Sequence, residues 1–451
     1  MGPMEVPADA YYGASTQRAR LNFPISDLRF KRPFLRALGL IKGAAAQTNS
    51  SLDLLANDIS NPIEEASREV ADGKWDDQFV VDIFQTGSGT STNMNANEVI
   101  ANRAAEILGG DRGSKLVHPN DHVNMGQSSN DVIPTTIHLS ALMEIEATLI
   151  PSLQALESAL LAKSEEFWGV VKTGRTHLQD ATPVRLGQEF LGYAGQIERG
   201  IVRARHAKAQ LSEVALGGTA VGTGVNTHPR FAQLVCRSLS DTLSIEVRET
   251  ENHFQAQNSL DAVLEASGSL RTIAVSMQKI ANDVRWMGSG PRAGIGEIAL
   301  PEVQPGSSIM PGKVNPVIAE SVLQVVAQVF GCDAAICQAA QGGYFELNMM
   351  MPVAAHNLLQ EIELLAASAK NFSERCVEGL QATARASETV ERGLMLATAL
   401  APAIGYDAAT TIAKDAAKTG RTIREVALEQ TDLSSQQLEE LLDPGAMTEP
   451  G

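Results

Sequence analysis

The stretch from Gly306 to Pro316 contains the residue types best suited to chemistry. Its sequence is GSSIMPGKVNP, which places Ser307 and Ser308 next to each other and one cation, Lys313, a few positions later. Asparagine is a good helix N-cap and proline is favoured at the first helical position, so Asn315–Pro316 predict that a helix begins here. The positive end of that helix would face the two serines. The stretch therefore predicts a flexible loop that binds a small anion.

Two further residues could supply acid–base chemistry without a cofactor. His177 lies in the sequence GRTHLQDATP, which predicts a polar loop between two long helices. Glu320 lies in an otherwise apolar stretch, 317–326, where a carboxylate needs a partner and a histidine from a neighbouring helix end would serve. Each residue also has a structural interpretation, because a lone histidine is usually part of the fold and Glu320 could form a structural ion pair. The combination favours an acid–base site.

A nucleotide site fits the sequence less well. The loop from Gly306 to Lys313 nearly matches a phosphate-binding P-loop, but it has one residue too many between its glycines. Val314 also stands where Ser or Thr should hold magnesium. The glycine-rich stretches 217–224 and 288–294 fail the spacing of a dinucleotide-binding loop.

Metal binding and serine hydrolysis are also disfavoured. His118 and His122 are four residues apart, but Pro119 lies between them and no third ligand stands out. The GxSxG motif of a strand–turn–helix serine nucleophile does not occur. We therefore expect neither a metal nor a cofactor.

Charge and cysteine content exclude several classes of partner. The 451 residues carry 36 basic and 53 acidic side chains, a net charge of −17, so neither nucleic acid nor an anionic membrane is an expected partner. The four cysteines form no CxxC pair, which favours free thiols in a reducing interior. The N-terminal residues lack a basic segment followed by an apolar stretch, and no apolar run approaches the roughly 18–20 residues that span a bilayer. The composition predicts a soluble, cytoplasmic protein.

The elements that must position these residues are helices. Apolar side chains recur at spacings of three and four in many segments, which is the pattern of one buried helical face. Long segments of this kind predict helices at 33–59, 62–72, 142–160, 183–211, 260–286, 317–330 and 352–372. Shorter helices are predicted at 387–400, 406–419 and 422–428. No strand-like alternation of useful length occurs.

These segments predict an all-α fold with three domains. Residues 1–127 mix short helical patterns with Gly, Asn and Pro, residues 128–384 hold the long helices of a bundle, and residues 385–451 form a small C-terminal helical domain. Two asparagine-rich stretches, 85–98 and 118–131, are costly unless they line a site or form turns. One protomer cannot bury all the apolar faces of five long helices, so we expect a homo-oligomer whose helices pack across subunits.

Four motifs together resemble the aspartase/fumarase superfamily and, within it, the class II fumarate hydratases. They are GSSIMPGKVNP from Gly306, GRTHLQDATP from Gly174, TGSGTSTNMNANE from Thr86 and HPNDHVNMGQSSND from His118. The resemblance runs from the start of the chain to MTEPG at its end. It implies reversible hydration of fumarate to (S)-malate without a cofactor. It also implies a homotetramer with a core of long helices, in which each active site is assembled from three subunits.

The resemblance implies roles for individual residues. Ser307 is expected to be the base that takes the proton from malate C3, and Lys313, Asn315 and the loop N–H groups are expected to hold the resulting aci-carboxylate. His177, paired with Glu320, is expected to handle the departing hydroxyl group through a water. The positions that match the family's substrate-binding residues are Ser88, Gly89, Thr90, Ser128, Ser129, Asn130, Thr176, Ser308, Lys313 and Asn315. The positions that match a second, non-catalytic dicarboxylate site are His118, Pro119, Asn120 and Asp121.

Two other functions stay open. An aspartate ammonia-lyase would use the same base and form the same product, and Val317–Ile318–Ala319 resembles aspartases at this position. Ser88 and Trp286 instead favour fumarate hydratases. A non-catalytic helical scaffold is the third possibility, but a scaffold needs none of the catalytic residues that this chain retains together.

Overall fold

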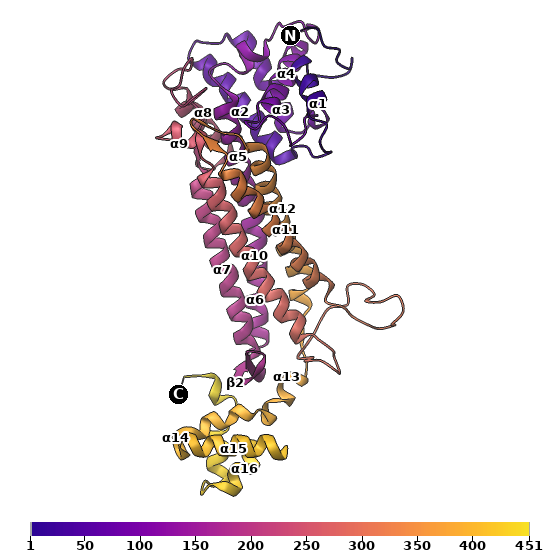
Figure 1. Ribbon diagram of the computed structural model, residues 1–451, viewed down its shortest axis with the longest axis vertical. Coiled ribbons are helices and arrows are strands. Elements are labelled where there is room, and N and C mark those ends of the chain that lie inside the picture. The colour runs from indigo at the N-terminus through magenta and orange to yellow at the C-terminus, as the bar shows by residue number, and fades with distance from the viewer. Residues whose placement is uncertain (1, 451) are drawn as a thin grey trace. The chain divides into compact units, whose positions relative to one another are not determined.

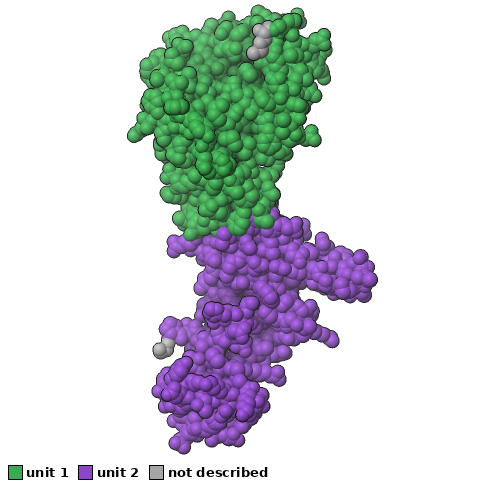
Figure 2. All heavy atoms as spheres, viewed as in Figure 1, with its two compact units in different colours: residues 1–151, 202–272, 327–366 green, residues 152–201, 273–326, 367–451 purple. Residues whose placement is uncertain are grey.

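A computed structural model describes residues 2–450 of the chain. Its secondary structure is mainly helical (Figure 1), with only short strands, so the predicted all-α class is confirmed. Contacts divide the chain into two compact units, which Figure 2 shows in different colours. Unit 1 contains residues 1–151, 202–272 and 327–366, and unit 2 contains residues 152–201, 273–326 and 367–451. This grouping follows contacts and not sequence order, and the three sequence-based domains stay a prediction.

The first helices belong to unit 1. They are α1 Ala14–Asn22, α2 Arg32–Ser51, α3 Asn57–Ala71 and α4 Thr90–Ile107, with a 3₁₀ turn at Asp76–Gln78. The predicted helix 33–59 ends early, at Ser51, because the chain turns at Asp53 with a φ of 59°. The next helix, α3, therefore begins at Asn57 and contains Pro62 in its first turns, where the missing N–H of proline costs little.

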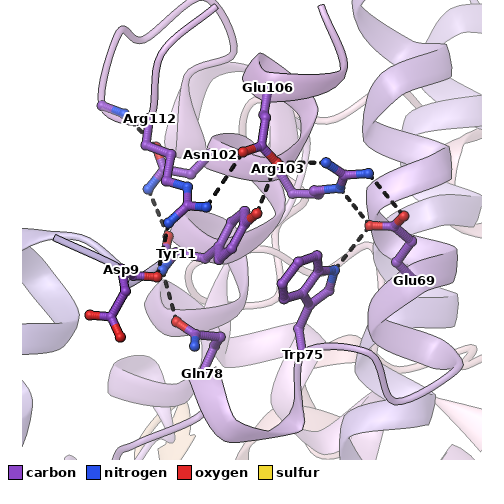
Figure 3. A network of polar contacts seen from close by, with 10 residues as sticks. Asp9, Tyr11, Glu69, Trp75, Gln78, Asn102, Arg103, Glu106 and Arg112 are labelled. Atoms are coloured by element: carbon purple, nitrogen blue, oxygen red, sulfur yellow. Dashed lines mark hydrogen bonds and ion pairs between the residues drawn. The ribbon is translucent and has the colours of Figure 1, made fainter. Parts of the chain in front are cut away.

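A polar network fixes the segment before α1 to α3 and α4 (Figure 3). The Tyr11 hydroxyl donates to Glu106 Oε2 at 2.8 Å. Arg103 of α4 donates from two nitrogens to the two oxygens of Glu69 on α3, at 2.7 and 3.1 Å. The Trp75 indole donates to the same carboxylate at 3.0 Å. The network thus joins three parts of the chain that are distant in sequence.

Long helices form most of the rest. They are α5 Ser129–Glu144, a π-helical turn Ile145–Leu149, α6 Ile150–Glu166, α7 Leu186–Leu211, α10 Asp261–Met287, α11 Val317–Ala340 and α12 Met351–Arg375. Tyr193 of α7 donates to Asp283 of α10 at 3.0 Å, and Ser267 of α10 donates to Asp333 of α11 at 2.8 Å. These side-chain contacts show that the helices are neighbours, as the bundle prediction requires.

The GRTHLQDATP stretch folds as a β-hairpin, so the predicted loop is wrong. Strand β1 Val171–Thr176 pairs antiparallel with β2 Gln179–Arg185, and the two turn residues have φ values of 56° and 61°. Both values are left-handed, as a tight two-residue hairpin turn requires. Because Pro183 is part of β2, helix α7 begins at Leu186 and not at residue 183. These strands are short and polar and lack the alternation of apolar residues that predicts a strand, so the sequence did not indicate them.

Small elements complete the fold between the long helices. They are α8 Phe231–Leu243, α9 His253–Asn258, a parallel pair β3 Glu213–Val214 with β4 Arg248–Glu249, and antiparallel pairs β5 Ile298–Ala299 with β8 Gln381–Ala382 and β6 Gly343–Tyr344 with β7 Leu347–Asn348. A π-helical turn at Pro119–Val123 and a 3₁₀ turn at Val377–Gly379 also occur.

The C-terminal residues surround a hydrophobic cluster of their own, which includes Leu400, Ile412 and Val426. Their helices are α13 Arg385–Glu388, α14 Ala401–Ile404, α15 Tyr406–Thr419, α16 Ile423–Gln430 and α17 Ser435–Leu441, with 3₁₀ turns at Val390–Arg392, Leu394–Leu400 and Ala446–Thr448. The predicted helix 387–400 is broken because Gly393 is extended.

Helix α11 corrects one expectation from composition. By length and composition alone it could cross a membrane, and it is the single helix of that kind among residues 2–450. The sequence-based statement that no apolar run approaches this length is therefore wrong for α11. The helix nevertheless carries Asp333, whose carboxylate accepts from Ser267 and pairs with Arg271 of α10.

Candidate active site

Three hydroxyl groups meet in unit 1. Thr90 Oγ1 lies 2.7 Å from Ser88 Oγ and 2.7 Å from Ser129 Oγ. Gly89 has a φ of 71°, and a side chain there would meet Ile133 at 2.9 Å, so the turn that presents Ser88 and Thr90 requires glycine. The cluster offers neutral hydroxyl donors of the kind that can bind carboxylate oxygens.

The N-terminus of α5 is held by the buried Asp131. Ser128 caps the helix: its hydroxyl accepts from the Asn130 N–H at 3.2 Å, and its own N–H donates to Asp131 Oδ1 at 2.9 Å. Asp131 Oδ2 accepts from the N–H groups of Gly217 and Thr219 at 3.1 and 2.9 Å. Burial raises the pKa of Asp131, and the three N–H groups oppose that rise. These contacts fix the substrate-binding candidates at the positive end of α5.

The predicted second dicarboxylate site is a tight turn. His118 directly precedes the π-helical turn that starts at Pro119. His118 Nδ1 accepts from the Asp121 N–H at 3.1 Å and also lies 3.1 Å from Asp121 Oδ2. Asn120 and Asp121 are exposed. The turn is therefore accessible, and binding of a dicarboxylate there stays a prediction.

Thr176–His177 lies exposed at the turn of the hairpin, and a buried ion network fixes the strand that carries it. Lys172 Nζ lies 2.9 Å from Glu189 Oε1 and 3.2 Å from Glu297 Oε2. Arg175 Nη2 lies 2.8 Å from Glu297 Oε1. The side chains of Lys172 and Glu297 are each 1% exposed. Loss of either one would therefore leave the other as a buried charge without this partner, which is strongly destabilising.

The serine loop is closed by its own hydrogen bonds. The Gly306 N–H donates to the Lys313 carbonyl at 3.0 Å, and Asn315 Nδ2 donates to the Gly306 carbonyl at 2.5 Å. A side chain at position 306 would meet the Lys313 carbonyl oxygen at 2.0 Å, so only glycine fits. Asn315 therefore closes the loop through its amide N–H, and α11 begins at Val317. The prediction that the Asn315 side chain caps this helix is wrong.

Ser307 Oγ is the acceptor of two backbone hydrogen bonds. The N–H groups of Ile309 and Met310 donate to it at 3.2 and 3.0 Å. Such donors stabilise negative charge on the oxygen they contact. The loop lines a hollow of about 440 Å³ that includes Ser307 and Lys313. The loop thus presents a hydroxyl oxygen and a cation to the same hollow.

Glu320 lies partly buried in the first turn of α11. Within residues 2–450 of this single chain, no hydrogen bond or ion pair joins Glu320 to His177. Their pairing stays a prediction.

The structure brings some predicted residues together and leaves others apart. Those that meet in unit 1 are Ser88, Thr90, Ser128, Ser129 and Asn130. Those that lie in unit 2 are Thr176, His177, Ser307, Ser308, Lys313, Asn315 and Glu320. In the described part of the chain, no group of three or more His, Cys, Asp and Glu side chains is placed to hold a metal ion.

Sequence reasoning missed Lys172, Glu297 and Asp131. A signal was available for the first two: Lys172 directly follows two valines, and Glu297 directly precedes an isoleucine. A charged side chain next to apolar residues in the sequence is a candidate for burial, and a buried charge needs an ion of opposite sign. A lysine and a glutamate that both lie next to apolar residues therefore suggest a buried ion pair.

Family models and known relatives match this chain over most of its length. Residues 2–331 match the family model described as Lyase, and residues 396–449 match the model described as Fumarase C C-terminus. A class II fumarate hydratase from Halobacterium salinarum is 56% identical over 100% of this chain and 96% of its own. A class II fumarate hydratase from Bradyrhizobium diazoefficiens is 51% identical over 100% of this chain and 96% of its own.

A solved structure agrees. The class II fumarase from Schistosoma mansoni superposes with a TM-score of 0.96 and 40% identity, over 98% of this chain and 96% of its own. The fold and site thus define a helical lyase with a fumarase C type of C-terminal domain. More closely, the chain belongs to the class II fumarate hydratase family.

Proposed function

We propose that this protein catalyses the reversible hydration of fumarate to (S)-malate. The main support is the closed serine loop, in which Ser307 Oγ accepts hydrogen bonds from two backbone N–H groups. The chain also belongs to the class II fumarate hydratase family. The reaction needs a base at carbon, a holder for the developing dianion and an acid for the hydroxyl group. The candidate residues supply these three functions.

Ser307 is the proposed base. In the direction from malate, its ionised oxygen takes the proton from C3, and the electron pair moves into the adjacent carboxylate to give an aci-carboxylate. The N–H groups of Ile309 and Met310 favour the ionised form of Ser307 before the reaction. Lys313 and Asn315 are proposed to hold the charge that develops on the substrate, together with Ser308.

His177 is the proposed partner for the leaving hydroxyl group. With Glu320 beside it, a protonated imidazole would deliver a proton through a water, so that the C–O bond breaks and water leaves as the C=C bond forms. Thr176, next to it in the hairpin turn, is proposed to bind the substrate. The buried network of Lys172 and Glu297 holds the hairpin that carries both residues.

Substrate carboxylates are proposed to bind the hydroxyl cluster of unit 1. Thr90 already lies within hydrogen-bond distance of both Ser88 and Ser129, so the three hydroxyl groups can turn to a ligand without large movement. Gly89, Ser128 and Asn130 shape and complete this pocket. The turn at His118–Asp121 is proposed as a second, non-catalytic dicarboxylate site.

We also propose a homotetramer in which each site draws its residues from three subunits. Supporting this, His177 and Glu320 lack a mutual contact within the described residues of one chain. The four cysteines are free in the structure, which is compatible with the reducing cytoplasm as the proposed location.

One assay tests the reaction. The purified protein is offered malate and aspartate separately, and the ultraviolet absorbance of fumarate's conjugated double bond is followed. We expect fumarate from malate alone. Fumarate from aspartate alone would instead identify an aspartate ammonia-lyase, and no product from either would favour a scaffold.

A further inference from the structure

The two asparagine-rich stretches of unit 1 converge on one buried lysine. Lys42 lies on α2 and is 0% exposed. An ammonium group is almost never fully buried unless it is paired, because it loses its water. Among the described residues no carboxylate forms an ion pair with Lys42. Its hydrogen-bond partners are therefore neutral groups, and they come from the asparagine-rich stretch that precedes α5.

Amide oxygens replace the lost water. Lys42 Nζ donates to Asn124 Oδ1 and to Gln127 Oε1, each at 3.0 Å. The same Asn124 oxygen accepts from the Nδ2 groups of Asn93 and Asn97 on α4, each at 3.2 Å. Two helices and the turn before α5 thus meet at one cation. Asn124 thus contacts Lys42 directly, and Asn93 and Asn97 contact Asn124.

The two amides that hold Lys42 also fix the backbone of their own turn. Asn124 Nδ2 donates to the Gln127 carbonyl at 3.0 Å, and Gln127 Nε2 donates to the Val123 carbonyl at 3.1 Å. Each side chain thus binds Lys42 through its oxygen and the backbone through its nitrogen. Ser128, the helix cap, is the next residue in the chain.

A second anchor lies on the other side of the substrate-binding segment. Asp131 follows that segment directly and is tied to Gly217 and Thr219. Lys42 and Asp131 also attract one another across the interior: burial lowers the pKa of Lys42 to about 7, and Asp131 opposes that fall. Residues 128–130 are thus clamped in sequence between a turn held by a cation and a carboxylate held by backbone N–H groups.

We propose that Lys42 is a positioning residue for carboxylate recognition: through Asn124 and Gln127 it holds residues 128–130 where Ser129 meets Thr90. The proposal rests on the proposed function, since it takes this segment to bind the substrate. Lys42 itself need not touch the substrate.

Substitution of the lysine tests the proposal. The variant Lys42→Met keeps the length of the side chain and removes the charge. We expect the KM for fumarate and the Kd for succinate, a dicarboxylate that cannot react, to rise about tenfold, the loss of one hydrogen bond to a charged group. We expect kcat to change less than threefold, because the base and acid lie in other segments. An unchanged KM and Kd in a folded Lys42→Met protein would overturn the proposal.

A matched control separates positioning from stability. Lys163 is also almost buried, and it donates to Glu166 and to the Leu380 carbonyl at 2.7 and 2.8 Å, in unit 2. Lys163→Met is expected to lower the unfolding temperature without raising the KM. An equal rise of KM in both variants would show that Lys42 acts only through general stability and would overturn the proposal.

A milder variant covers the case in which Lys42→Met does not fold. Gln127→Met removes one of the two oxygens that hold the ammonium and is expected to raise the KM and the succinate Kd about threefold. An unchanged KM there overturns the proposal. Two measurements distinguish failure of this proposal from failure of the proposed function. Succinate binding to the unmodified protein without fumarate turnover contradicts the proposed function alone, whereas normal fumarate turnover with an unchanged KM and succinate Kd in Lys42→Met overturns the positioning role alone.

Discussion

Ser307, the proposed base, is surrounded by backbone hydrogen-bond donors. Its oxygen accepts two N–H groups from the residues that follow it, in a loop that Gly306 and Asn315 close. A neutral hydroxyl gains little from two donors, whereas an alkoxide gains much more. The same loop carries Lys313. If Ser307 is the base, as proposed, these local contacts would favour its ionised form.

Ser307→Ala is expected to abolish hydration with little structural change. The hydroxyl is lost, but the bonds from Gly306 to Lys313 and from Asn315 to Gly306 remain. We expect kcat to fall about 10²–10⁴-fold, the usual contribution of a positioned general base. Steady-state kinetics and the unfolding temperature measure this. Near-normal turnover in a folded variant would place the base elsewhere.

Glu69 provides a prediction for acid stability. Burial raises its pKa, but hydrogen bonds from Arg103 and Trp75 outweigh burial and lower the pKa from 4.5 to about 2. A depressed folded-state pKa adds stability that is complete above pH 4.5 and is lost as the pH falls towards 2. The contribution is at most about 3 kcal/mol, and less where water reaches the network.

The comparison of Glu69→Gln with the unmodified protein checks this. Denaturant unfolding at pH 7 and at pH 3 should show a large difference between the two proteins at pH 7 and a smaller one at pH 3. The pair Lys370–Glu374 is a suitable control, because its charges are exposed and 3.9 Å apart. Glu374→Gln should change stability little at either pH. An equal Glu69→Gln effect at both pH values would contradict the linkage.

At the scale of elements, the β1–β2 hairpin depends on Glu297. The Glu297 carboxylate accepts a hydrogen bond from Arg175 and forms an ion pair with Lys172, both on β1. The backbone of Glu297 donates to the Met287 carbonyl and accepts from the Thr383 N–H. One residue therefore joins the hairpin to the end of α10 and to the strand after α12. The position of the turn that carries His177 follows from this junction.

Glu297→Gln is expected to destabilise the fold and to impair catalysis. The buried Lys172 and the partly buried Arg175 each lose a charge partner, although Lys172 keeps Glu189. The cost should therefore be about 3 kcal/mol, the low end for breaking a buried ion pair. Thermal unfolding measures the stability. The pH profile of kcat is the second readout, because a displaced His177 should shift its acidic or basic limb. A variant with normal stability and profile would refute the role.

The sequence predicted the elements unequally. Helix α10 was predicted at 260–286 and found at Asp261–Met287, because its apolar residues repeat without a proline to interrupt them. The hairpin was not predicted because its strands are polar and because the ion pairs that hold it involve residues distant in the sequence. The serine loop was located by its motif, but its closure by Asn315 depends on three-dimensional contact. Lys42 was missed because a lysine in a helix is ordinarily solvated, and its burial depends on asparagines far along the chain.

At the scale of the whole molecule, the long helices leave apolar side chains uncovered. Leu191 and Val202 of α7, Val275 of α10 and Phe330 of α11 are 39–51% exposed. Exposed apolar side chains on several long helices are compatible with association with further copies of the chain. This agrees with the proposed tetramer, and it allows a test of shared active sites.

Two inactive variants should restore activity when they are mixed. If each site takes Ser307 from one subunit and His177 from another, joint refolding of equal amounts of Ser307→Ala and His177→Asn should give about a quarter of the unmodified activity, since a quarter of the sites receive both intact residues. Each variant refolded alone is the control. Activity that stays at the level of the controls would show that one chain supplies both residues to a site.

The exposed tip of the serine loop has a consequence for how this enzyme should lose activity on storage. Ile309 is 83% exposed and Met310 50% exposed, two and three residues after the proposed base Ser307. A loop held mainly by its own hydrogen bonds opens without global unfolding, and its methionine can be oxidised and its backbone cleaved while it is open. Damage would then remove individual sites and leave the helices intact. Loss of activity on storage is therefore expected to run ahead of any loss of helical signal.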